Sequence, residues 1–162
     1  MARLLTIGVY GFNRDSFLAA LEGAGVTLLI DVRQRRGVRG AEYAWANSKR
    51  LQAALAEAGI GYEHRPELAP TTELRQLQYA RDDQLGVGKR NRQELSAEFR
   101  EAYTAEILDA ADLGAVRSLL PEDGAAALLC VERDPEACHR SLVAERLAAA
   151  DGTVEVAHLR PA

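Results

Sequence analysis

Leu128-Leu129-Cys130-Val131-Glu132-Arg133-Asp134-Pro135-Glu136-Ala137-Cys138-His139-Arg140 is the stretch that indicates the fold most strongly. It starts within an apolar run, residues 125–131, and continues into an amphipathic segment, residues 135–150. This pattern predicts a strand that leads into a helix through a short turn. Asp134 suits the N-cap and Pro135 the first helical position, where a missing N–H costs no intrahelical hydrogen bond.

The same stretch carries chemically reactive groups to one edge of the predicted sheet. Cys130 and Glu132 fall at the carboxyl end of the strand, and the opening turns of the helix contain Cys138, His139 and Arg140. The N–H groups and the dipole of a helix N-terminus favour anions. We therefore expect a thiol, a carboxylate, an imidazole and a guanidinium to meet at a candidate anion-binding site.

Further apolar runs are typical of buried strands, and they occupy residues 3–9, 26–32, 60–64 and 154–159. Helical patterns separate them, which predicts a mostly parallel sheet of about five strands with helices on both faces. We expect one α/β domain over residues 1–162, a three-layer Rossmann-like fold with strand order 3-2-1-4-5. Strands one and four would be neighbours at the switch point, where ligands usually bind.

The connecting segments contain two candidate N-caps and two loops. Asn13 and Asn47 each precede a helical pattern and are suited to cap it. Residues 33–46 are rich in Arg and Gly and are predicted to form a long loop. Residues 71–120 are predicted to be helical, apart from a polar loop over residues 82–94.

The C-x-E-x-D-P-x-x-C-H-R pattern of residues 130–140 resembles the hallmark of a bacterial and archaeal family, the domain of unknown function numbered 488. Other pieces are similar to that family, namely Thr6-Ile7-Gly8, Asp31-Val32-Arg33, Ala58-Gly59-Ile60-Gly61-Tyr62 and Pro66-Glu67-Leu68. The chain departs from the family where members often carry His or a pair of Gly, at Val9 and at Ala69-Pro70. The resemblance covers nearly the whole chain and implies a fold, but no established reaction.

Length and composition indicate an ordinary globular protein. The chain has 162 residues, which suits one domain, and its net charge is −4. Its two cysteines are too few for a disulfide framework, so we expect thiols, metal ligands or redox partners. No apolar run approaches the ~20 residues of a membrane helix, and no secretory signal region is evident. We predict a cytoplasmic protein without a membrane partner.

Positive charge is concentrated in two places despite the negative total. One group comprises Arg33, Arg35, Arg36, Arg39, Lys49 and Arg50, and the other comprises Lys89, Arg90 and Arg92. A local basic patch attracts polyanions, so nucleic acid could bind through Arg35, Arg36 and Arg39. The nearby aromatic residues Tyr43 and Trp45 would then either stack on bases or fold the loop back onto the domain.

The candidate site combines catalytic and ligand-binding residues. Cys138 is expected to be a nucleophile or a redox-sensitive thiol, because a helix N-terminus and nearby basic groups lower a thiol pKa. His139 would move a proton, and Glu132 or Asp31 would orient it or act as a base. The residues expected to hold or face the ligand are Arg33, Arg140, Cys130, Tyr10 and Asn13.

Each of these groups also has a structural alternative. The cysteines could simply pack in the core, and Arg140 could pair internally with Glu132 or Asp31. A metal could be bound by Cys130, Cys138, His139 and His64, but the cysteine spacing is not that of a zinc finger or knuckle. We predict no metal and no cofactor.

These observations favour an enzyme, a hydrolase or transferase, that binds an anionic small molecule such as a nucleotide or phosphoester. One alternative is a module that binds nucleic acid or protein through the basic loop of residues 33–50. Another is a redox sensor based on the cysteine pair.

Overall fold

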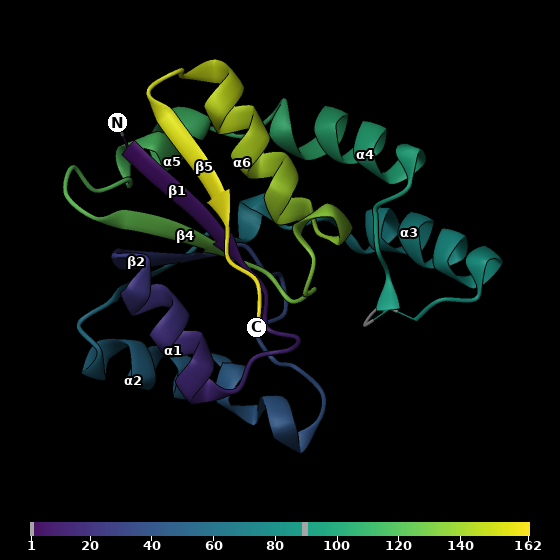
Figure 1. Cartoon of the computed structure of the whole chain (residues 1–162). Helices are drawn as coiled ribbons and strands as arrows, with labels where there is room; N and C mark the ends of the chain where they lie inside the picture. Colours follow the sequence, from purple (N-terminus) through teal and green to yellow (C-terminus); the bar gives the residue numbers. More distant parts are fainter. Residues whose placement is uncertain (1, 89–90) are drawn as a thin grey trace.

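The computed structural model describes residues 2–88 and 91–162, and within them five strands form one parallel sheet (Figure 1). The strands are β1 (Ala2–Ile7), β2 (Val26–Asp31), β3 (Gly61–His64), β4 (Ala125–Leu129) and β5 (Val154–His158). Helices flank the sheet, so the predicted α/β fold is confirmed.

The strand order is β3-β2-β4-β1-β5, and the predicted order 3-2-1-4-5 is wrong at the centre. The expected pairing of β1 with β4 is present, but β4 also pairs with β2 and separates it from β1. Strands that follow one another in the chain are often, but not always, neighbours in the sheet. Every residue of β4 is buried, as a central strand requires. Asp31, expected one strand away from the Cys130 strand, therefore pairs directly with Leu129 of that strand.

Two helical layers cover the sheet (Figure 1). One contains α1 (Arg14–Gly23) and α2 (Ser48–Glu57), and the other contains α4 (Ala97–Tyr103), α5 (Leu113–Ser118) and α6 (His139–Ala150). Successive strand residues face opposite layers, so Leu129 packs in the α1–α2 core while Leu128 and Cys130 pack in the other. The remaining helix, α3 (Thr72–Leu85), packs against α4.

The connection from β4 to α6 differs from the single turn and continuous helix that we predicted. β4 ends at Leu129, so Cys130 and Glu132 follow the strand. Asp134 precedes one 3-10 turn, Pro135–Ala137, and Cys138 then adopts an extended conformation at the N-cap position of α6. This extended residue interrupts the helical path, because its ψ angle of 145° is incompatible with an α-helix.

The loops also differ in detail from the prediction. Residues 33–46 include a 3-10 helix, Ala41–Ala46, whose Tyr43 and Trp45 pack on Tyr10 and Phe17, so these aromatics fold the loop back onto the domain. The predicted loop at residues 82–94 starts later, because α3 continues to Leu85. Lys89 and Arg90 lie outside the described residues. None of the described helices combines the length and the apolar character needed to cross a membrane.

Candidate functional site

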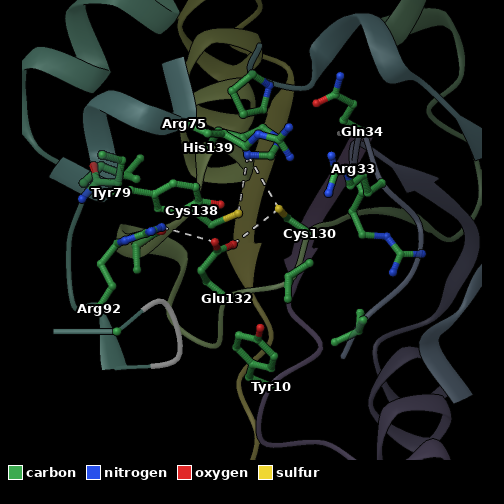
Figure 2. Close-up of a pocket in the computed structure, with 18 of the residues that line it drawn as sticks. Tyr10, Arg33, Gln34, Arg75, Tyr79, Arg92, Cys130, Glu132, Cys138 and His139 are labelled. Atoms are coloured by element: carbon green, nitrogen blue, oxygen red, sulfur yellow. Dashed lines mark hydrogen bonds and ion pairs between the residues drawn. The ribbon is translucent and has the colours of Figure 1, made fainter. Parts of the chain in front are cut away.

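A cavity of about 650 Å³ opens at the carboxyl end of the sheet. Most of its lining residues come from the loop after β2, from helix α3 with the segment that follows it, and from the β4–α6 connection (Figure 2). Tyr10 after β1 and Phe99 on α4 also line it. Among the described residues, five arginines and one carboxylate line it, which makes the cavity electropositive in a chain of net charge −4. The charged lining residues are Arg33, Arg35, Arg39, Arg75, Arg92 and Glu132.

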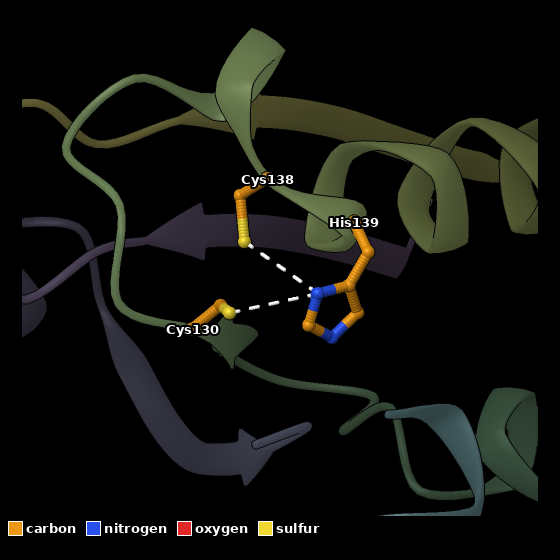
Figure 3. A group of neighbouring side chains, drawn as sticks. All are labelled: Cys130, Cys138 and His139. Atoms are coloured by element: carbon orange, nitrogen blue, oxygen red, sulfur yellow. Dashed lines mark hydrogen bonds between the residues drawn. The ribbon is translucent and has the colours of Figure 1, made fainter. Parts of the chain in front are cut away.

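Two thiols and one imidazole meet in the wall of this cavity (Figure 3). The Nδ1 atom of His139 lies 3.6 Å from Sγ of Cys130 and 3.8 Å from Sγ of Cys138. The Nε2 atom lies 3.0 Å from the carbonyl oxygen of Val32. Because a carbonyl can only accept, Nε2 must carry the hydrogen, and Nδ1 is left to interact with the sulfur atoms.

The two thiols differ in their acidity. Burial by itself raises the pKa of Cys138, but the hydrogen bond with Cys130 and the charge of His139 outweigh burial and bring that pKa well below its ordinary value. Burial and the neighbouring Cys138 raise the pKa of Cys130 well above its ordinary value. Although burial lowers the pKa of His139, the charge of Cys138 raises it overall. Cys138 is therefore the more acidic thiol of the pair.

Glu132 connects the thiols to an ion-pair network on α3. Its carboxylate lies 3.5 Å from Sγ of Cys130 and 3.3 Å from a guanidinium nitrogen of Arg92 (Figure 2). Arg92 also donates to both carboxylate oxygens of Asp82, over distances of 2.7–3.1 Å. A further bond from Arg92 reaches the carbonyl of Ala137. Asp82, on α3, is thus buried together with its partner Arg92, which lies on the segment that follows this helix.

Asp31 and Arg33 form a second buried pair beside the cluster. The guanidinium donates to both carboxylate oxygens of Asp31, at 2.9 and 2.8 Å, and to the carbonyl of Ala46. Asp31 is fully buried and is not among the cavity-lining residues. Arg33 does line the cavity, but its hydrogen bonds are directed inward. His64, weighed as a fourth metal ligand, contacts the carbonyl of Arg33 instead, at 2.7 Å.

Two residues expected to face the ligand do not line the cavity. Arg140 is completely buried and donates to the carbonyls of Glu132 and Arg133, so the expectation that it faces an open pocket is wrong. Asn13 caps α1, as predicted, by accepting a hydrogen bond from the amide of Ser16. Asn47 stands at the N-cap position of α2, but its side chain accepts from the amide of Val38 and makes no capping bond. Tyr10 lines the cavity.

Helix α3 supplies lining residues that the sequence analysis did not identify. Arg75, Gln78 and Tyr79 line the cavity, and Asp82 anchors Arg92. Their positions follow the i, i+3, i+4, i+7 spacing of one helical face. A polar stripe at that spacing was the available signal, but polar stripes on helices usually face solvent.

The fold and this cavity define a class of α/β protein with a thiol, imidazole and carboxylate cluster at the carboxyl edge of a parallel sheet. The chain belongs to the family described as Domain of unknown function DUF488, whose family model matches residues 13–147. The match includes all of residues 128–140, so the resemblance seen in the sequence is confirmed. No curated protein and no solved structure matches the chain.

Proposed function

We propose that the protein is an enzyme that binds an anionic small molecule, such as a nucleotide or another phosphoester, and catalyses hydrolysis or group transfer on it. The observation that carries this proposal is that one cavity combines Arg35 and Arg75, which form no ion pair within the described residues, with an acidic thiol, an imidazole and a carboxylate. Anion binding and a reactive group in the same concave site are typical of enzymes acting on charged substrates.

Arg35 and Arg75 are the residues proposed to bind the anion. Within the described part of the chain neither forms an ion pair, and Arg75 has only a 3.4 Å hydrogen bond to the hydroxyl of Thr72. Arg33 and Arg92 already bind Asp31 and Asp82 bidentately. A guanidinium without a carboxylate partner can form bidentate hydrogen bonds with a phosphate or carboxylate, which supports this assignment.

The chemical step is assigned to the cluster in the cavity wall. Cys138 is the proposed nucleophile, and His139 is the base that accepts its proton through Nδ1. His139 cannot also reach a substrate through Nε2, because that nitrogen is bound to Val32. Glu132, which lines the cavity, is therefore proposed to exchange protons with the substrate or with water.

The position of the basic loop favours a small anion over a nucleic acid. The sequence suggested that nucleic acid could bind through Arg35, Arg36 and Arg39. Arg35 and Arg39 line the same cavity as the thiols, and Arg36 lies 3.5 Å from the hydroxyl of Tyr62. Nucleic-acid binding stays an alternative that the following measurement also tests.

Calorimetric titration with inorganic phosphate, pyrophosphate and adenine nucleotides tests the proposal. We expect at least one of them to bind, and the double variant Arg35→Ala, Arg75→Ala to weaken binding at least about 10-fold, equivalent to ~1.4 kcal/mol. The double variant Lys49→Ala, Arg50→Ala is the matched control, because it removes the same two charges from exposed positions outside the cavity lining.

Two results would count against the proposal. One is the absence of binding by all of these anions at low salt, where electrostatic attraction is strongest. The other is tight binding of RNA or DNA that Arg35→Ala weakens while no small anion binds. The second result would favour the nucleic-acid alternative.

A further inference from the structure

We infer that Cys130, Cys138 and His139 form a binding site for a divalent metal ion, with zinc as the ion that best suits the donors. Both cysteines of the chain are in this cluster, and one ligand atom from each of the three residues lies within 4.8 Å of the others. Two sulfurs and one imidazole nitrogen form a soft, borderline donor set, which zinc prefers over magnesium or calcium.

The separations match those of a coordinated ion. Zinc bonds of about 2.3 Å to sulfur and about 2.0–2.1 Å to nitrogen, at tetrahedral angles, put a sulfur about 3.6 Å from the nitrogen. The two sulfurs lie 3.6 and 3.8 Å from Nδ1 of His139. Both sulfur–nitrogen separations therefore already fit a shared ion, and the two sulfurs lie within 4.8 Å of each other.

Hydrogen bonds alone do not account for the approach of both sulfur atoms to Nδ1 of His139. Nδ1 has either one lone pair or one proton, so it can form one good hydrogen bond, yet two sulfurs approach it at similar distances. A metal ion at the centre would use all three donors. The Nε2–H bond to Val32 has the form that metal-binding histidines usually show, since a backbone carbonyl fixes the tautomer and leaves Nδ1 free to coordinate.

The three donors line the cavity, so a fourth coordination position can be occupied by water or substrate. Three protein ligands and one open position are characteristic of catalytic zinc sites. The inference thus deepens the proposed function. One consequence rests on that function: a bound ion would supply a coordinated water as the nucleophile in place of Cys138. The anion-binding residues keep their role.

The protonation states give a measurable signature. The coordinated form has two thiolates and an unprotonated Nδ1. Any proton that these three donors hold before binding must therefore be released when the metal binds.

Cobalt(II) titration of the full chain, reduced and stripped with a chelator, tests the inference directly. We expect one ion per chain, with strong visible bands of a tetrahedral ion and near-ultraviolet bands from thiolate-to-cobalt charge transfer. Zinc should remove both sets of bands by displacing cobalt. Zinc titration in weak buffer should release protons as the ion binds.

Variants assign the ligands. Loss of an outer-sphere partner typically costs 10–100-fold in metal affinity, so Cys138→Ser and His139→Asn should each cost more than about 100-fold in competition with a chromophoric chelator. His64→Asn is the matched control, because this histidine also binds a backbone carbonyl through Nε2 but is outside the cluster. Its metal affinity should equal that of the parent.

A parent protein without thiolate-to-cobalt bands, or a Cys138→Ser variant that develops them at the same cobalt concentrations as the parent, would overturn the inference. The parent spectrum decides the matter even if a variant does not fold, which circular dichroism would detect. The cobalt spectra need no anion and therefore test the metal site alone. Phosphate titration of the parent and of the Arg35→Ala, Arg75→Ala variant tests the anion site, so a failure of one site is distinguished from a failure of the other.

Discussion

Arg140 supports the backbone that carries the candidate site. Its guanidinium donates to the carbonyls of Glu132 and Arg133, at 2.6 and 3.1 Å, and its side chain is completely buried. These two carbonyls belong to the turn between Cys130 and Cys138. Arg140 therefore holds the two thiol-bearing segments together without contacting the cavity.

Replacing Arg140 by Met should lower the free energy of unfolding by at least about 1–3 kcal/mol, because the buried carbonyl of Glu132 loses its partner and the part-buried carbonyl of Arg133 loses a second bond. Urea denaturation measures the change. The control Arg133→Met removes a guanidinium that is 60% exposed while keeping the backbone carbonyl, and it should change stability by less than about 0.5 kcal/mol. If Arg140→Met were as stable as the parent but unable to bind phosphate, the residue would be an anion receptor after all.

Gly8 is constrained by the same turn. A Cβ atom on Gly8 would lie 1.9 Å from the carbonyl oxygen of Glu132, so the Gly8→Ala variant must move one backbone segment away from the other. We expect a loss of at least about 1–3 kcal/mol in unfolding free energy. In Gly23→Ala no atom lies within 4 Å of the new Cβ, and the change should stay within about 1 kcal/mol. Equal denaturation midpoints for the two variants would contradict this steric argument.

At the scale of elements, α3 is joined to the β4–α6 connection through Arg92. Asp82 on α3 binds this guanidinium, which also reaches Glu132 and the carbonyl of Ala137. One arginine thus connects a helix, the segment after it and the turn that precedes α6. The part of the cavity wall formed by α3 and residues 91–95 depends on this connection.

The Asp82→Ala variant leaves Arg92 buried without its bidentate partner, which should cost about 3–5 kcal/mol of stability. Both side chains are only 5% exposed, so solvent screening is weak. Hydrogen exchange should accelerate first in α3 and in residues 91–95, since these segments lose their common anchor. Asp83→Ala removes the adjacent, exposed carboxylate and should leave the free energy of unfolding and the hydrogen-exchange rates unchanged. Uniform acceleration across the sheet would instead indicate global destabilisation.

At the scale of the whole molecule, strand order determines which groups meet. Because β4 lies between β2 and β1, the residues after β4 are adjacent to the ends of both neighbours. The Nε2 of His139 can therefore reach Val32, 107 positions away in the chain. The order predicted from the sequence would have put β1 between these segments.

The sequence by itself determined the features that depend on neighbouring residues. Apolar runs located the five strands to within a few residues, Asn13 identified the start of α1, and the 130–140 pattern identified the family. These signals are local, because strand and helix periodicity and capping each involve residues within a few positions of one another.

Only the tertiary structure decided the strand order and the partners of the charged groups. Arg33, Arg92 and Arg140 look alike in a sequence, yet the first two bind carboxylates and the third binds backbone carbonyls. Arg35 and Arg75 come from separate segments and share a cavity. The physical reason is that hydrogen-bond and ion-pair partners are chosen by distance in space, which follows from how the helices and strands pack and not from local sequence.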